Sequence, residues 1–483
     1  MPEPKIEDLV VLLPGITGSV LQKDGEDVWA ISGQAIFNAL TSMGDSINEI
    51  RLQGEDPPLS ELLNMDEKKL EDAGDGVRAT RLMNDIHGIL GFWKVDGYSK
   101  ISRQICRNLN MIPGSLHGTE PANFFEFPYD WRRDNRVAAV RLKKLIDRQL
   151  PLWRERSGAG KAKVILIGHS MGGIVSRYYL EVLEGWRDCK ALITFGTPYR
   201  GSVNAVNFLA NGYKKLFIDA TEVLRSCTSV YQLLPIYKML KIGNEYQRIA
   251  ETDGLPEGLA KDRAGRALAF HREIEDAVKK RPAGAYPIIP IVGICQPTLQ
   301  SAVLEGGAVQ ALESMPEGED DRLEGGDGTV PGVSAIPIEL SESYHETYFA
   351  EQHGSLQNND HVLTDLLRRM SHMQTGLKLA AFRDSIAVLP AIGLKVDDLY
   401  LKNEPVVIKA KLAGVRRDVP PIARIEPAGQ REKTVQAQFR EGQDGWELTL
   451  EKPMPGLYRV EVSLGEAGPG APSPVHGIFE VAG

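Results

Sequence analysis

The chain has 483 residues, of which 42% are hydrophobic and 25% are charged, and its formal net charge at pH 7 is -9. This length exceeds one ordinary core, so we expect two or three domains, or one large domain with insertions. The acidic balance disfavours nucleic acid as a partner and argues against a polybasic membrane-docking surface. The first residues lack the basic and apolar regions of a secretory signal, and no apolar run reaches the length of a transmembrane helix. We therefore expect a cytoplasmic protein.

A buried strand is predicted at Leu9–Leu13, a run of five aliphatic residues. The loop after it, Pro14-Gly15-Ile16-Thr17-Gly18-Ser19, is rich in glycine. A strand that ends in such a loop leaves backbone N–H groups free to point into a cleft, although an ordinary strand-exit turn has a similar composition. We interpret residues 20–97 as an insertion at the rim of an active site. Three short elements are predicted within it: Val28–Trp29, Ile36–Leu40 and a helix over Leu59–Leu70.

Helices and a strand alternate over the next part of the chain. Apolar residues at helical spacing predict helices over Gly97–Leu109 and Val137–Leu150, and a strand is predicted between them at Asn123–Phe127. This strand runs into the motif Pro128-Tyr129-Asp130-Trp131-Arg132-Arg133. We expect its two arginines to pair with neighbouring aspartates and to fasten the loop.

Residues 163–175 carry the most informative pattern. Val164–Ile167 predicts a buried strand, Gly168-His169-Ser170-Met171-Gly172 follows at once, and apolar residues at helical spacing come next. A strand, Gly-x-Ser-x-Gly and a helix form the context of a nucleophile elbow, in which a sharp turn exposes the serine at the N-terminus of the helix. A glycine-rich turn with a capping serine is the alternative. We predict that Ser170 is a nucleophile.

A further buried strand is predicted at Lys190–Phe195, and it exits through Gly196-Thr197-Pro198. Residues 204–283 then predict a helical cap without a strong strand. Its three predicted helices are Val206–Leu216, Val230–Leu240 and Ala264–Val278. The apolar side chains of this cap suit the binding of acyl chains, although packing of the cap against the core would require the same residues. They are Leu209, Phe217, Leu224, Tyr231, Leu233 and Leu234.

The last predicted core elements are followed by a region of different amino-acid composition. The core elements are predicted as a strand at Tyr286–Val292, an acidic, glycine-rich loop over residues 300–326, a strand at Ser343–Phe349 and a helix at Val362–Met370. From about residue 395, short β-rich runs alternate with proline and glycine turns, which predicts an all-β sandwich. Its predicted strands are Val406–Leu412, Ala423–Ile425, Thr434–Phe439, Trp446–Leu450, Tyr458–Val462 and Gly477–Val481.

An acid and a base are expected to follow the nucleophile in the chain. Asp327 lies in a Gly-Asp-Gly-Thr-Val-Pro turn, where the flanking glycines allow its carboxylate to approach another side chain closely. Among the histidines after this acid, His353 lies in the loop between the last predicted strand and helix, where a base belongs. His361, at the start of that helix, is the alternative. We therefore predict a triad of Ser170, Asp327 and His353.

The chemistry of such a triad is acyl transfer through a serine ester. A histidine must take the serine proton as attack begins, and an aspartate holds the imidazole in the required tautomer. The backbone N–H groups of Ile16 and Met171 are the predicted oxyanion donors. Water as the second substrate gives hydrolysis and an alcohol gives transacylation. No metal and no cofactor are expected.

Five motifs occur in an order that resembles the lecithin:cholesterol acyltransferase family. They are the Pro14–Ser19 loop, Pro128-Tyr129-Asp130-Trp131-Arg132, the elbow with Gly173, Gly196-Thr197-Pro198 and Gly326-Asp327-Gly328-Thr329-Val330-Pro331. The resemblance covers roughly residues 7–372. It implies an α/β-hydrolase fold, acyl esters of lipids as substrates, and, by position, the same triad and oxyanion donors as above.

The chain also departs from this family. Secreted members carry a signal peptide and a disulfide-closed lid, and we find neither pattern here. Some members have a polar residue where this chain has Ile16. The domains we expect are therefore a catalytic domain over residues 1–390, with cap or lid insertions at about 20–97 and 204–283, and an appended immunoglobulin-like β sandwich over residues 395–483.

Three functions remain open at the level of sequence. The leading one is a lipase-like or phospholipase-like serine hydrolase or O-acyltransferase that acts on a lipid and contacts a membrane surface transiently. The second is a carboxylesterase for small soluble esters, which a closed, small pocket would favour. The third is an effector or binding protein whose lipase-like domain is regulated through a protein partner of the β domain.

Overall fold

The structure is a computed structural model. It describes residues 6–30, 49–84, 96–215, 218–317, 325–341, 347–374, 390–414, 419–428, 430–442, 445–465 and 471–482.

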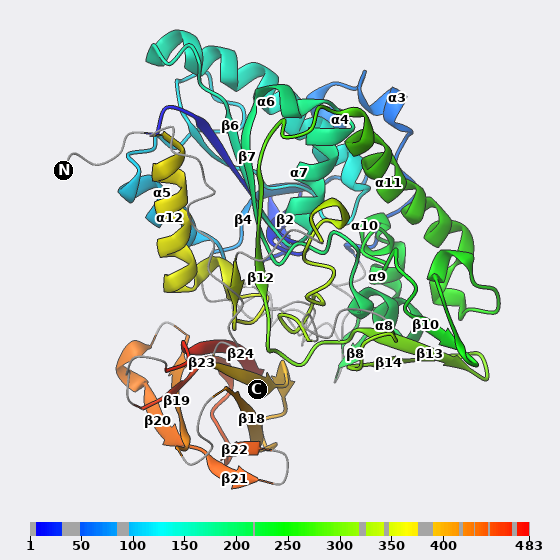
Figure 1. The fold of residues 1–483 in the computed structure, drawn as a ribbon, viewed down its shortest axis with the longest axis vertical. Coiled ribbons are helices and arrows are strands. Elements are labelled where there is room, and N and C mark those ends of the chain that lie inside the picture. Colours follow the sequence, from blue (N-terminus) through cyan, green and yellow to red (C-terminus); the bar gives the residue numbers. More distant parts are fainter. Residues whose placement is uncertain are drawn as a thin grey trace.

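A sheet of six parallel strands forms the centre of the larger part of the molecule (Figure 1). In spatial order its strands are β15 (Tyr348–Phe349), β12 (Ile288–Gly293), β7 (Cys189–Phe195), β6 (Val164–His169), β1 (Leu9–Leu13) and β5 (Phe124–Glu126). The inner strands consist almost entirely of buried aliphatic residues, which is the composition of strands covered on both faces. Because all six strands are parallel, their carboxyl ends lie at one edge of the sheet.

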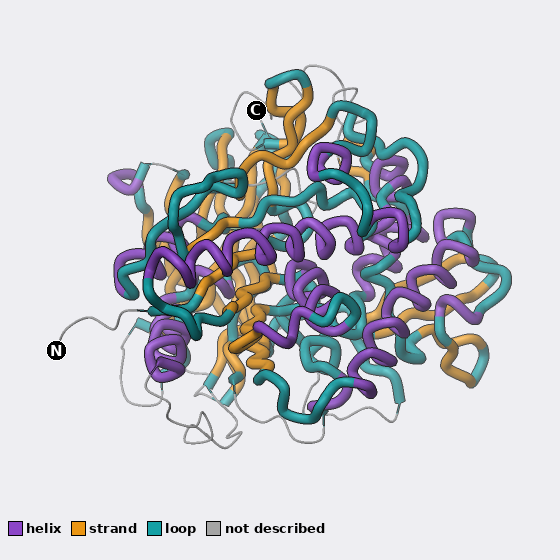
Figure 2. The backbone as a smooth tube through the Cα atoms, turned by 90° about the horizontal axis from the view of Figure 1, so that it is seen from above, coloured by secondary structure: helices purple, strands orange, loops and turns teal. Residues whose placement is uncertain are grey.

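Helices cover both faces of this sheet (Figure 2). On one face, α5 (Ser99–Asn108) and α12 (Asp360–Gln374) bury Tyr98, Ile101 and Leu366 in a core with alternate residues of the strands. On the other face lie α6 (Asn135–Ser157), α7 (Met171–Glu181) and α11 (Lys261–Lys280). The helix predicted to end at Leu150 continues through Pro151 to Ser157, and the buried Trp153 packs this last part against the core.

The first insertion contains more strand than its sequence predicts. A three-stranded sheet forms from β2 (Ser19–Lys23), β3 (Glu26–Trp29) and β4 (Val77–Leu82). The helix predicted over Leu59–Leu70 is wrong as one element: two short helices form, α3 (Leu59–Leu62) and α4 (Glu67–Glu71), because Asp66 accepts a hydrogen bond from the Lys69 amide and caps the second one. The predicted element Ile36–Leu40 lies outside the described residues.

The second insertion is not purely helical, which corrects the prediction of a cap without strands. Its helices are α8 (Val203–Asn211), α9 (Thr221–Ser226), α10 (Thr228–Tyr231) and α11. Its strands β10 (Leu240–Ile242) and β11 (Glu245–Gln247) join a hairpin of β13 (Ser301–Glu305) and β14 (Ala308–Leu312) in a four-stranded sheet, and β8 (Lys214–Lys215) pairs with β9 (Ile218–Asp219). The hairpin occupies the first part of the loop predicted at 300–326. Strands of two to five residues leave too short a pattern to be recognised in sequence.

The C-terminal residues form two β sheets that enclose one apolar core, in which Ile408 and Val460 are fully buried. One sheet contains β16 (Ala391–Val396), β18 (Val406–Ala413), β22 (Gly445–Leu450) and β21 (Arg440–Gly442). The other contains β17 (Leu399–Tyr400), β24 (Val475–Val481), β23 (Gly456–Leu464), β19 (Pro421–Pro427) and β20 (Val435–Gln438). Every pair is antiparallel except β17 with β24. Figure 1 shows this sandwich below the larger part of the molecule, with β23 and β24 on the side toward it.

The described residues contain neither a membrane-spanning helix nor a cluster of metal ligands. No helix in these segments combines the length and apolar character needed to cross a bilayer. Within the same segments, histidine, cysteine and carboxylate side chains do not gather into a group of three or more that could hold a metal ion.

We expect Glu480→Gln to stabilise the protein at alkaline pH. Burial raises the pKa of the Glu480 carboxyl from 4.5 to about 7, and its Oε2 atom has no hydrogen-bond partner among the described residues. A raised pKa means that the folded state favours the neutral acid, so stability is lost as pH rises from about 4.5 to about 7. The amide removes this penalty, which we put at about 1–3 kcal/mol at pH 8 and much less at pH 5.

Urea unfolding of both proteins at the two pH values measures this difference. Glu441→Gln, on an exposed strand of the same sandwich, is the control and should show no such dependence on pH. An equal effect of Glu480→Gln at pH 5 and pH 8 would contradict the assignment.

Candidate active site

Ser170 occupies a strained turn between β6 and α7. Its backbone has φ 52° and ψ -124°, a conformation that residues with a side chain rarely adopt. The turn is held on both sides, since the Ser170 amide donates to the Phe195 carbonyl at 2.9 Å and the Thr197 hydroxyl donates to the Ser170 carbonyl at 3.0 Å. The elbow predicted from sequence is therefore present in the structure.

Three glycines allow neighbouring backbones to approach this turn closely. A Cβ atom on Gly168 would lie 2.6 Å from the Cα of Gly173, and one on Gly172 would lie 2.5 Å from the Pro14 carbonyl oxygen. A Cβ on Gly15 would lie 2.9 Å from the Cβ of Ser170. These distances are too short for any side chain, so the glycines bring the loop after β1 directly against the elbow.

Asp327 and His353 complete a hydrogen-bonded chain with Ser170. The Nε2 atom of His353 lies 2.9 Å from Ser170 Oγ, and its Nδ1 atom lies 2.7 Å from Asp327 Oδ2. The Asp327 carboxylate is buried, and its Oδ1 atom accepts hydrogen bonds from the amides of Thr329 and Val330 at 2.9 and 2.7 Å. The loops after β6, β12 and β15 thus bring the three predicted residues together.

The alternative base lies elsewhere. His361 is exposed in the first turn of α12, where its amide donates to Asn359 Oδ1. Of the strand predicted at Ser343–Phe349, the structure describes the last three residues, of which Tyr348 and Phe349 form β15; residues 342–346 lie outside the described part of the chain.

The loop after β1 lies where oxyanion donors are expected. Thr17 adopts φ 62° within it, and Gly15 contacts Ser170 as described above. Among the described residues, the amides of Ile16 and Met171 have no hydrogen-bond acceptor. Both predicted donors are therefore available, one from this loop and one from the first residue of α7.

A buried chain of hydrogen bonds, which sequence reasoning missed, connects this loop to the base. The Gly15 amide donates to the Tyr98 hydroxyl at 2.8 Å, and that hydroxyl lies 2.8 Å from His169 Nδ1. His169 Nε2 lies 3.0 Å from the His353 carbonyl oxygen. Burial, followed by the nearby His353 ring, lowers the pKa of His169 well below its usual value, so this histidine is neutral. It therefore donates from Nε2 and accepts the Tyr98 proton at Nδ1.

Gly196 lies against the contact between Asp327 and His353, which the sequence does not reveal. It has φ 50°, and a Cβ at this position would lie 2.5 Å from Asp327 Oδ2 and 2.9 Å from His353 Nδ1. The Gly196-Thr197-Pro198 motif thus makes room for the contact between acid and base, and its threonine holds the Ser170 carbonyl.

A cleft of about 470 Å³ opens beside Asp327 and His353. Its walls come from the second insertion, the Asp327 and His353 loops, and the C-terminal sandwich, and most of its side chains are polar. Examples are Asn204, Asn207, Tyr213, Lys214, Gln352, Lys395 and Asp398. Its size falls within the usual range of ligand pockets, roughly 300–1,000 Å³.

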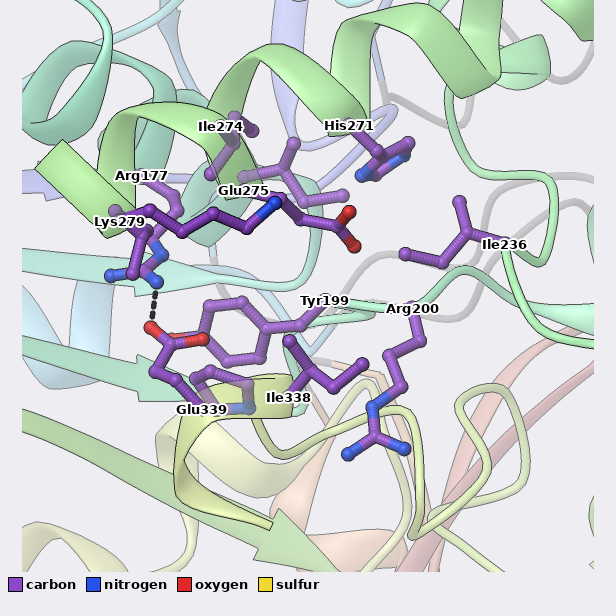
Figure 3. A pocket seen from close by; sticks show the side chains of 13 residues that line it. Arg177, Tyr199, Arg200, Ile236, His271, Ile274, Glu275, Lys279, Ile338 and Glu339 are labelled. Carbon is purple, nitrogen blue, oxygen red and sulfur yellow. Dashed lines mark hydrogen bonds and ion pairs between the residues drawn. The ribbon is translucent and has the colours of Figure 1, made fainter.

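A second, more apolar cavity of about 240 Å³ lies between α7, α11 and the turn at Ile338 and Glu339 (Figure 3). Isoleucine side chains from several elements line it, and Arg177 and Glu339 form an ion pair at one end. Asp327 and His353 line the larger cleft, whereas this cavity is lined by none of Ser170, Asp327 and His353; Ser170 lines neither of the two.

The apolar side chains predicted for acyl binding pack the insertion onto the core. Leu209, Leu224, Tyr231, Leu233 and Leu234 are buried in the main apolar cluster, which supports the packing alternative. Phe217 lies outside the described residues. Their burial leaves them unavailable to a substrate in this conformation.

The two arginines after Trp131 hold the first insertion in place through ion pairs, which is the structural role expected for them. Arg132 makes a bidentate pair with Asp130 and also contacts Asp75 at 2.9 Å. Arg133 does not pair with Asp130 or Asp134; its Nε atom lies 2.8 Å from Asp56. The partners Asp56 and Asp75 lie far away in sequence, and so local spacing does not reveal them.

We expect Tyr98→Phe to destabilise the fold by about 1–3 kcal/mol, because the buried Gly15 amide and His169 Nδ1 both lose their partner. Urea unfolding measures the change. Tyr179→Phe is the matched control, since the Tyr179 hydroxyl makes no hydrogen bond to another described residue. Equal losses in both variants would contradict the role of the Tyr98 hydroxyl.

Comparisons with known proteins give matches to a protein family and to solved structures. Residues 91–253 match the model of the lecithin:cholesterol acyltransferase family. The chain is similar to a protein in the crystal structure of the Tle4–Tli4 complex, with a TM-score of 0.50 and 15% identity over 77% of this chain and 100% of that chain. It also matches the Bacillus licheniformis lipase BlEst2 in its propeptide form, with a TM-score of 0.33 and 12% identity over 99% of this chain and 94% of that chain. Among curated proteins no match was found.

The predicted fold class is confirmed: an α/β-hydrolase fold is followed by C-terminal antiparallel β sheets. The family match supports lipid acyl hydrolase or acyltransferase activity in general terms. The resemblance to the lecithin:cholesterol acyltransferase family that the motifs predicted is thereby confirmed over residues 91–253.

Proposed function

We propose that this chain is a serine hydrolase or O-acyltransferase that acts on acyl esters of lipids through an acyl-serine intermediate. The observation that carries this proposal is the hydrogen-bonded chain from Ser170 through His353 to Asp327 at a strained elbow. The family match over residues 91–253 supports lipids as the substrate class.

In the proposed acylation step, Ser170, His353 and Asp327 each have a separate role. Ser170 Oγ attacks the ester carbonyl carbon while His353 Nε2 takes its proton, and Asp327 stabilises the imidazolium that forms. The carbonyl oxygen becomes an oxyanion, which accepts hydrogen bonds from the Ile16 and Met171 amides. Collapse of this intermediate breaks the bond to the alcohol, which leaves with the proton from His353.

The second step removes the acyl group by the reverse route. His353 takes a proton from water or from an acceptor alcohol, and that oxygen attacks the acyl-serine carbonyl. Water yields a carboxylic acid, whereas an alcohol yields a new ester. The triad performs both reactions equally well, so the acceptor that the cleft admits decides between them.

A specific observation favours the second candidate, a carboxylesterase for small soluble esters. The cleft beside His353 is lined largely by polar side chains, and the apolar residues of the cap are packed against the core. To bind a long acyl chain, the cap would therefore have to rearrange, or the chain would have to stay in the surface layer of a membrane. A cytoplasmic location, transient membrane contact and a protein partner for the β sandwich stay predictions.

Ser170→Ala should lower kcat for p-nitrophenyl butyrate by about 10⁴-fold or more, because no nucleophile remains. His353→Ala should cause a comparable loss. His361→Ala is the matched control and should retain wild-type activity, since that side chain is exposed on α12. Wild-type turnover by Ser170→Ala would contradict the proposal that the chain is an enzyme. Loss of turnover in His361→Ala alone would show that the base is misassigned.

Chain length separates the two candidate functions. If lipids are the substrates, kcat/KM on p-nitrophenyl esters should rise at least about tenfold from acetyl to octanoyl, because added methylenes bind apolar surface. Phospholipid vesicles should also be hydrolysed, and added diacylglycerol tests transfer to an alcohol. Activity confined to acetyl and butyryl esters would favour the carboxylesterase instead.

A further inference from the structure

A buried carboxylate lies two residues before the base histidine. Glu351 has no exposed surface, and a buried charge of this kind is costly unless it is paired and hydrogen-bonded. Its Oε1 atom accepts from the amides of Gln352 and His476 at 2.8 and 2.9 Å. Its Oε2 atom accepts from Asn359 Nδ2 and pairs with His476 Nδ1, both at 2.8 Å. Its basic partner, His476, belongs to β24 of the C-terminal sandwich.

Two acidic groups face the His476 ring from different parts of the molecule. Glu351 lies at Nδ1, and Glu461 of β23 lies 3.4 Å from Nε2. Burial by itself opposes protonation, but the charge and hydrogen bond of Glu351, followed by those of Glu461, raise the pKa of His476 to about 10. His476 is therefore an imidazolium near neutral pH, and it donates to Glu351.

The sandwich contacts the same loop directly at one further point, and it reaches a second point through Asp96. Gln352 Nε2 donates to the Leu394 carbonyl of β16 at 2.9 Å. The Asp96 amide donates to the Gly354 carbonyl at 2.7 Å, and the Asp96 carboxylate pairs with Arg459 of β23. Within residues 351–354, the C-terminal sandwich thus contacts Glu351 and Gln352 directly and reaches Gly354 through Asp96.

We propose that His476 is a positioning residue for the base. By neutralising and hydrogen-bonding the buried Glu351, it fixes the loop that places His353 Nε2 against Ser170 Oγ. The C-terminal sandwich is then a structural part of the active site, beyond the wall that it contributes to the cleft. This inference rests on the proposed function of Ser170, Asp327 and His353.

Two substitutions at His476 test the proposal on the full chain. His476→Ala removes the side-chain donor, and we expect kcat for p-nitrophenyl butyrate to fall about tenfold or more while KM stays within about twofold. In His476→Asn, the Nδ2 atom occupies the place of His Nδ1 and keeps the hydrogen bond but not the charge, so kcat should lie between those of His476→Ala and wild type. Titration of active sites with a fluorophosphonate normalises kcat to the folded enzyme.

Glu461→Gln is the matched control, because it alters the other face of the same imidazole and leaves the Glu351 contact intact. We expect it to turn over like wild type. Wild-type kcat per titrated site in His476→Ala would overturn the proposal, as would equal losses in His476→Ala, His476→Asn and Glu461→Gln. If His476→Ala does not fold, Glu351→Gln takes its place, with the same expected loss and the same contrary outcome.

Different variants test the positioning role of His476 and the proposed function. If Ser170→Ala retains wild-type activity, the function itself is wrong. If Ser170→Ala is inactive and His476→Ala is fully active per site, only the positioning role fails.

Discussion

The backbone of Ser170 is the constraint on which the site depends. A residue with a side chain in the positive-φ region costs about 1–3 kcal/mol, and such strain persists only when the surroundings over-determine it. Here β7 and Thr197 hold both backbone polar groups of Ser170, and Gly168 and Gly172 admit the neighbouring backbones. The buried parallel sheet supplies this stiffness, because β6 pairs along its whole length with strands on both sides.

The elbow gives three consecutive residues three different tasks. In the proposed mechanism Ser170 attacks and the Met171 amide stabilises the oxyanion. His169 points to the other side, where it links the Tyr98 hydroxyl to the His353 carbonyl. A neutral imidazole suits this position, because one nitrogen must accept and the other must donate. The loop after β1 and the base are therefore aligned with the nucleophile through one buried side chain rather than independently.

Patterns that are local in sequence predicted most of the site. The elbow, the turn around Asp327 and the loop position of His353 each follow from a few adjacent residues, and the strand runs at Leu9–Leu13 and Val164–Ile167 from their composition. Tyr98, Gly196 and Glu351 were missed because their partners are remote in sequence. The short strands of the two insertions were missed for another reason: two to six residues carry too little periodicity, and their pairing is decided by tertiary contacts.

The strand before Ser170 is much longer than the strand before His353. Ser170 follows β6, a six-residue strand in the interior of the sheet, whereas His353 follows β15, a two-residue strand at its edge. An edge strand this short contributes few ladder hydrogen bonds, so it holds the loop after it weakly, and a further bond of this loop runs from the His353 amide to the Asp327 carbonyl at 2.7 Å. The contacts of residues 351–354 with the C-terminal sandwich compensate for this weakness. A buried charge pair suits the task, because loss of either partner leaves the other uncompensated and the arrangement has no equally stable alternative.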